Sequence, residues 1–203
     1  AADKSDDACN AAYDEAQRLV LSPLAAAKFI LAKMRCSPDK PKLGGAYMLA
    51  SCARTFGGDA FATRNFILGD FFVVDVDNKL RFDESMTLKE DYDFTCANIH
   101  QYGAVLRCQR MTLRVKHYDN AGGACTNRDK KGKEEQKNIA ILKQKWPRAI
   151  RDHHKRKNEV ILQWPVDNDA KGLVTPPKAK SKGKKDAKAS NGSKSKKVIK
   201  VAG

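Results

Sequence analysis

The sequence predicts a mixed α/β fold followed by a separate lysine-rich segment. Two local patterns alternate along residues 1–167: apolar residues at helical spacing, and short apolar runs bounded by Gly, Pro, Asn or Asp that are typical of strands. The total of 203 residues suits one domain with appendages. We therefore expect a helical segment over residues 1–40, a mixed sheet flanked by helices over 41–167, and a disordered tail over 168–203, where apolar residues almost disappear.

Helical patterns occupy the N-terminal segment. Residues 6–21 are rich in Ala and carry acids at their start, which favours a helix by propensity and through the helix dipole. Ser22 can cap a second helix whose first position is Pro23, and the pattern continues to about Cys36.

The following segments favour strands. GGAYMLASCA (residues 44–53) is predicted as a short buried strand, and FILGDFFVVDVDN (66–78) as a strand with a Gly-Asp break. KLRFDESM (79–86) is predicted as a short strand or an extended segment. The run GAVLRCQRMTLRVKHY (103–118) is strongly β, and EVILQW (159–164) is the last predicted strand.

Two helices are predicted between these strands. Thr87 and Glu90 have the spacing of a capping box, so a helix should begin at Thr87 and run to about Tyr102. A second helix, EEQKNIAILKQKW (residues 134–146), should end at Pro147.

The composition and the opening residues limit the cellular compartments and the classes of partner that we expect for this protein. The net charge is +15, and no apolar run approaches the roughly 18 residues of a membrane span. The opening residues are acidic and polar, whereas a secretory signal is basic and then apolar. The cysteines lack CxxC and zinc-site spacings. We therefore expect reduced thiols in a nuclear or cytoplasmic protein with no membrane partner.

The acids at the start of the helix after Thr87 admit two interpretations. Glu90 and Asp91 can complement the helix dipole and complete a cap, each contributing about 0.3–1 kcal/mol. Alternatively, a carboxylate at a strand-to-helix junction points into the crevice where α/β proteins bind ligands, and can accept a proton from an attacking hydroxyl. Asp93 is predicted to be a solvated charge.

Candidate metal ligands are also open to two interpretations. Asp75 and Asp77 alternate at the end of a predicted strand, so both can reach one divalent cation, but an ordinary turn has the same residues. His117 precedes a Gly-rich loop and is either structural or a metal or phosphate ligand. His153 and His154 are predicted to belong to a solvated basic face.

Five segments in order resemble one family. They are LRFDESMTLKEDYDFT, YGAVLRCQRM, VKHYDNAGGA, the helix ending in KWP, and KRKNEVIL. Together they resemble the TET-associated glycosyltransferases, which have a GT-A fold and are linked to glucosylation of hydroxymethylated pyrimidines in DNA. The resemblance covers roughly residues 62–164.

The resemblance implies a reaction and a set of site residues. It implies transfer of a sugar, with glucose expected, from a UDP-sugar to the hydroxyl of a 5-hydroxymethylpyrimidine in DNA. Asp91 and Glu90 would orient or deprotonate that hydroxyl, and Gly69 would belong to the glycine loop. A divalent Mn or Mg ion would be held by His117, with Asp75 and Asp77 as weaker candidates; His117 would also contact the diphosphate.

One departure from the family pattern leaves an alternative open. In the GT-A order the metal-binding DxD precedes the glycine loop, whereas Asp75 and Asp77 follow Gly69. Residues 1–60 also show no clear counterpart of the nucleotide-binding half. We therefore expect a GT-A-like fold that is incomplete in that half, either diverged or truncated. The alternative is a non-catalytic DNA-binding protein that retains part of the glycosyltransferase fold beside a basic tail.

The tail is a polycation. Residues 168–203 contain eleven Lys, no Arg and two Asp, a net charge of +9, with paired lysines at Lys184, Lys185, Lys196 and Lys197. Such a segment suits the phosphate backbone of DNA, although a solubilising tail or a nuclear-import signal would have a similar composition. Without Arg or aromatic residues we expect no base reading.

Deletion of residues 168–203 tests the tethering interpretation. If the lysines neutralise phosphates, the deletion should make the dependence of log K on log salt concentration less steep, because fewer counterions are released. The measurement is a salt titration of DNA affinity for both chains, and an unchanged slope would contradict tethering.

Overall fold

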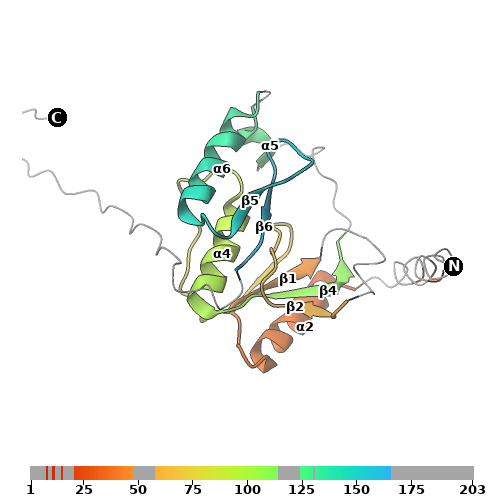
Figure 1. The fold of residues 1–203 in the computed structure, drawn as a ribbon. Coiled ribbons are helices and arrows are strands. Elements are labelled where there is room, and N and C mark those ends of the chain that lie inside the picture. Colours follow the sequence, from red (N-terminus) through yellow and green to blue (C-terminus); the bar gives the residue numbers. More distant parts are fainter. Residues whose placement is uncertain are drawn as a thin grey trace, which may run out of the picture.

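Figure 1 shows a computed structural model of the protein, which describes residues 21–47, 58–113, 124–129 and 131–165 and the helical residues Ala8, Ala11 and Glu15. The predicted helix over residues 6–21 and the second half of the predicted strand over 44–53 lie largely outside these ranges. The elements in chain order are α2 (Pro23–Cys36), β1 (Leu43–Tyr47), β2 (Phe61–Ala62), β3 (Phe72–Val74), α4 (Glu90–Tyr102), β4 (Leu106–Thr112), α5 (Ala124–Asn127), α6 (Lys133–Lys145), β5 (Ile150–Asp152) and β6 (Val160–Leu162).

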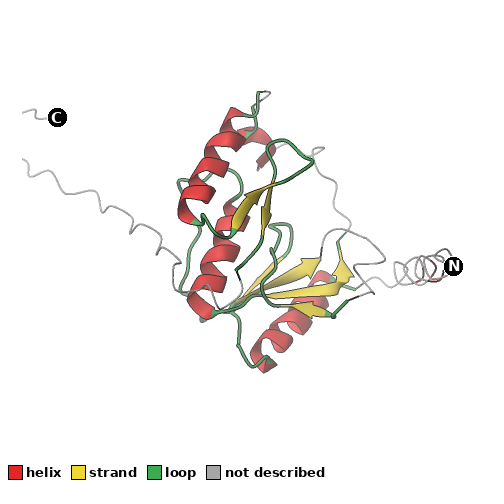
Figure 2. Ribbon diagram, in the orientation of Figure 1, coloured by secondary structure: helices red, strands yellow, loops and turns green. Residues whose placement is uncertain are grey.

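The prediction of a mixed α/β fold with a mixed sheet is confirmed (Figure 2). The main sheet has the order β2-β4-β1-β3, in which β1 and β4 are parallel and each outer strand is antiparallel to its neighbour. A separate antiparallel pair, β5 and β6, forms a hairpin. Within the described residues, no helix has the length and hydropathy of a membrane span.

Helix α2 begins as the sequence predicts. The Oγ of Ser22 accepts a hydrogen bond from the backbone N–H of Ala25 at 3.1 Å, and Pro23 occupies the first helical position. The buried side of α2 packs on one face of the sheet through Ile30 and Met34. This approach requires Gly44 in β1, because a Cβ there would lie 2.7 Å from the Met34 sulfur.

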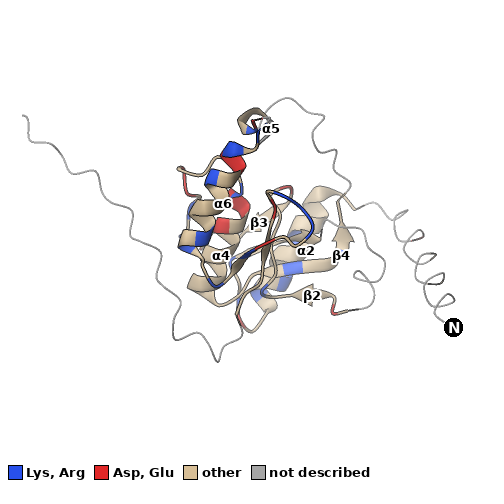
Figure 3. Cartoon of the chain, turned by 45° about the horizontal axis from the view of Figure 1, so that its top comes forward, with Lys and Arg blue, Asp and Glu red and all other residues tan. Residues whose placement is uncertain are grey.

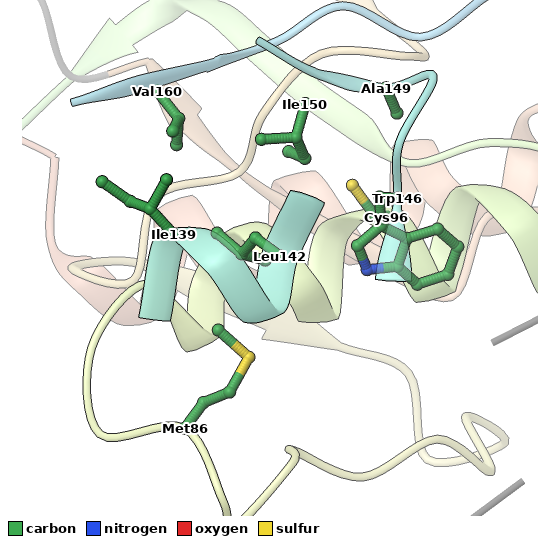
Figure 4. Close-up of a cluster of buried hydrophobic side chains, with 8 residues drawn as sticks. All are labelled: Met86, Cys96, Ile139, Leu142, Trp146, Ala149, Ile150 and Val160. Carbon is green, nitrogen blue, oxygen red and sulfur yellow. The ribbon is translucent and has the colours of Figure 1, made fainter. Parts of the chain in front are cut away.

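Helix α4 lies on the opposite face of the sheet. Since side chains alternate along a strand, Leu43 of β1 points away from α2 and packs in a cluster with Phe94 and Ile99 of α4. A second cluster joins α4 to α6 and to the β5–β6 hairpin (Figure 4). Its buried members are Met86, Cys96, Ile139, Leu142, Trp146, Ala149, Ile150 and Val160. Helix α4 is therefore covered on two sides.

The predicted cap at Thr87 is wrong. Helix α4 begins at Glu90, and its N-cap residue is Lys89, which has φ 63° and makes no side-chain capping bond. The hydroxyl of Thr87 instead donates to Oε1 of Glu134 at 2.7 Å and accepts from Nδ2 of Asn138 at 3.2 Å. These partners on α6 satisfy the hydroxyl, so a tertiary contact replaces the local cap.

The prediction that Asp93 is solvated is also wrong. Its carboxylate is buried, and accepts from Trp146 Nε1 and from Lys145 Nζ, both at 2.7 Å. Lys145 also donates to Asp83 at 2.9 Å. Burial alone would lower the pKa of Lys145, but its bonds to the two aspartates outweigh this effect and leave the pKa raised. The reason for the error is that both partners of Asp93 lie about fifty residues away in sequence.

Removal of the Asp93 carboxylate should destabilise the fold. In an Asp93→Ala variant the indole N–H and the half-buried ammonium lose their acceptor, which should lower the free energy of unfolding by about 3 kcal/mol. The matched control is Asp152→Ala, because Asp152 also pairs with a lysine but its side chain is 71% exposed, against 7% for Asp93. Urea unfolding measures both, and the control should change by less than about 1 kcal/mol. Equal losses in the two variants would contradict the assignment.

Candidate active site

Two of the residues predicted for the site lie in direct contact. The backbone N–H of Gly69, in the loop before β3, donates to Oδ2 of Asp91 at 3.2 Å. Oδ1 of Asp91 accepts from the backbone N–H of Tyr92 at 2.9 Å. The carboxylate is thus held by two backbone donors at the start of α4. The structure joins a residue predicted for the glycine loop to a residue predicted as the proton acceptor.

The loop that carries Gly69 is fixed to α4 by two further contacts. The hydroxyl of Thr95 accepts from the backbone N–H of Ile67 at 3.3 Å and donates to its carbonyl at 3.2 Å. The ring of Phe66 stacks on Tyr92 with centroids 3.8 Å apart. The sequence analysis did not identify Thr95 and Tyr92 as anchors for this loop. The hydrogen bonds of Thr95 and the stacking of Phe66 on Tyr92 therefore fix the position of Gly69 against Asp91.

The environment of Asp91 favours a carboxyl group that can take up a proton near neutrality. Burial raises its pKa to about 7 and the neighbouring charge of Glu90 acts in the same direction, while the N–H groups of Gly69 and Tyr92 and the charge of Lys89 oppose the shift. A general base works best when its pKa lies near the operating pH. Asp91 therefore combines an anchoring role for the loop with the titration expected of a proton acceptor.

The predicted metal ligands at the end of β3 do not fit a divalent cation. Asp75 is buried, and its Oδ2 accepts from Arg35 Nε at 3.0 Å and lies 4.0 Å from Lys42 Nζ. Its Oδ1 accepts from the backbone N–H of Asp77 at 3.2 Å, and the side chain of Asp77 is exposed. The bond from Arg35 is the main reason that the pKa of Asp75 is lowered. Both carboxylate oxygens of Asp75 therefore already accept hydrogen bonds, and two cationic side chains face its Oδ2.

The rest of the described chain offers no replacement for these ligands. Among those residues, no group of three His, Cys, Asp or Glu side chains is placed to hold a metal ion. His117 and the four tail lysines, Lys184, Lys185, Lys196 and Lys197, lie outside the described ranges, so the predictions about them stay predictions. The predicted basic face at His153 and His154 lies in the loop between β5 and β6, where His154 is exposed and His153 is half-buried.

No protein-family model, curated protein or solved structure matches this chain. Its function is therefore inferred from the geometry around Asp91 and from the residues that carry the resemblance.

The raised pKa of Asp91 can be measured by NMR through the two backbone amides that donate hydrogen bonds to its carboxylate. As Asp91 ionises, the amide proton shifts of Gly69 and Tyr92 should titrate together with a midpoint of about 7. Because this pKa lies above the ordinary value of 3.8, the folded state binds the proton more tightly, so the Asp91 contribution to stability should fall as the pH rises from about 4 to about 7. An NMR pH titration measures the shifts.

The chain contains an internal control for this titration. Asp129 accepts the backbone N–H of Lys131 at 2.8 Å, and backbone hydrogen bonds, first that of Glu134, lower its pKa. The Lys131 amide should therefore titrate below pH 3.8 in the same experiment. A Gly69 midpoint close to that of Lys131, or one that persists in an Asp91→Asn variant, would contradict the assignment.

Proposed function

We propose that this chain takes part in transfer of a hexose from a nucleotide sugar to the hydroxyl of a 5-hydroxymethylpyrimidine in DNA, with Asp91 as the proton acceptor. The observation that carries the proposal is the carboxylate of Asp91, whose pKa is raised to about 7 and which is held against Gly69. The resemblance of the segments around these residues to TET-associated glycosyltransferases supplies the class of substrate.

The proposed step balances in atoms and charge. The hydroxyl oxygen of the acceptor forms a bond to the anomeric carbon of the sugar, the bond from that carbon to the diphosphate breaks, and its electron pair leaves with the diphosphate. The hydroxyl proton passes to the carboxylate of Asp91. An alkyl hydroxyl is a weak nucleophile until a base takes its proton, and such base catalysis contributes typically about 10²- to 10⁴-fold. Because Asp75 and Asp77 do not fit a divalent cation, they are assigned no step.

A second candidate is a DNA-binding protein without transferase activity. In this case Asp91 has a structural role, since it accepts hydrogen bonds from the backbone N–H groups of Gly69 and Tyr92. Glu90 would then complement the helix dipole. The high net charge of +15 favours a polyanionic partner in either case.

An assay for a base-linked hexose separates the two candidates. The full chain is incubated with UDP-glucose and DNA that contains 5-hydroxymethyluracil or 5-hydroxymethylcytosine, with Mn²⁺ or with a chelator. Mass spectrometry of the nucleosides should find a hexose adduct. An Asp91→Asn variant should lose about 10²- to 10⁴-fold in rate, while the Asn amide oxygen can still accept the Gly69 N–H and preserve the loop.

The matched control is Asp39→Asn, which alters an exposed aspartate just after the end of α2 and should leave the rate unchanged. Full activity in Asp91→Asn would remove Asp91 from the mechanism. Tight DNA binding by the wild-type chain without any adduct would favour the second candidate.

A further inference from the structure

We propose that the β5–β6 hairpin is a docking surface for the phosphate backbone of duplex nucleic acid. The contacts are made by Arg151 on β5 and by Lys155, Arg156 and Lys157 in the connecting loop. This inference goes beyond the proposed function, because it requires binding alone and holds whether or not a sugar is transferred.

The hairpin loop has a defined conformation. The backbone N–H of His153 donates to the carbonyl of Glu159 at 2.8 Å and closes the loop at its base. The ring nitrogen Nδ1 of His153 accepts from the backbone N–H groups of Lys155 and Arg156, both at 3.1 Å. Burial, together with the charge of Arg156, lowers the pKa of His153 and keeps this nitrogen available as an acceptor. The backbone of the basic residues is therefore organised before any partner binds.

The hairpin presents positive charge that its own acids do not neutralise. Arg151, Lys155, Arg156 and Lys157 are exposed, and no carboxylate in the described part of the chain pairs with their side chains (Figure 3 colours such cations blue).

Both acids of the hairpin are paired with other elements. Asp152 accepts from Lys143 of α6 at 2.6 Å, and Glu159 accepts from Lys89 at 3.1 Å. The four cationic side chains are therefore available to bind an anion of a partner molecule.

The hairpin is also fixed to the body of the domain. Ile150 and Val160 are buried in the cluster with α4 and α6 (Figure 4). At the last residue of the loop, Oδ1 of Asn158 accepts a hydrogen bond from Gln136 of α6 at 3.3 Å. A cationic surface that is held in place loses less conformational entropy on binding than a flexible one.

The chemistry of the loop favours nucleic acid over a lipid surface. The loop residues 153–158 are His-His-Lys-Arg-Lys-Asn, with no apolar side chain to insert among lipids. Lys and Arg side chains are the principal phosphate ligands of DNA-binding proteins, and a two-stranded ribbon has dimensions that the major groove admits. Backbone contact of this kind gives affinity that depends strongly on salt.

The test compares two triple variants of the full chain. Lys155→Gln, Arg156→Gln and Lys157→Gln together remove the loop cations and leave His153 in place. The control replaces Lys28, Lys33 and Lys40 by Gln, which lowers the net charge equally on and beside α2, at the far end of the molecule from this loop in Figure 1. DNA affinity is measured by fluorescence anisotropy with a labelled duplex between about 50 and 200 mM salt.

The loop variant should reduce the slope of log K against log salt concentration by about 2 to 3, close to one for each phosphate that is no longer neutralised. The control should keep the wild-type slope, and circular dichroism should show that both variants are folded. An equal change in both variants, or no change in the loop variant, would overturn the proposal. So would a loss of binding to phosphatidylserine vesicles in the loop variant with DNA binding unaltered.

Discussion

The buried carboxylate of Asp93 joins helix α4, which carries Asp91, to the end of α6. A charge removed from water must be paired and hydrogen-bonded, and Asp93 meets this requirement through Trp146 and Lys145 at the end of α6. The pairing fixes the end of α6 against α4, and the cluster around Leu142 then positions the β5–β6 hairpin. The same pairing fixes the first turn of α4, which carries Asp91 two residues earlier.

Helix geometry gives the acids of this turn separate roles. Residues two apart in an α-helix point about 200° away from each other, so Asp91 and Asp93 face different neighbours. Asp93 is directed at α6, whereas Asp91 and Thr95, one turn apart, face the loop that carries Gly69. A chain that is basic overall therefore uses one carboxylate of this turn for assembly and keeps another at a raised pKa, as the proposed proton transfer requires.

The sequence predicted what depends on neighbours in the chain. The Ser22 cap and the end of α6 before Pro147 follow from local chemistry and are confirmed. Thr87 and Asp93 were mispredicted because their partners on α6 are brought close only by the fold. For the site, the sequence pattern identified Asp91 as a candidate. Its hydrogen bond to Gly69, 22 positions earlier, depends on how α4 anchors the loop, and no rule of residue spacing predicts that contact.

The pH dependence of hexose transfer tests the central claim, that the carboxylate held by Gly69 is the group that takes the proton. A base must be ionised to act, so kcat/KM, which reports the ionisation of the free enzyme, should rise with pH through a midpoint of about 7. This midpoint should equal that of the Gly69 amide titration. A rate that is independent of pH between about 5 and 9, or that rises with a midpoint different from that of the Gly69 amide, would contradict the claim.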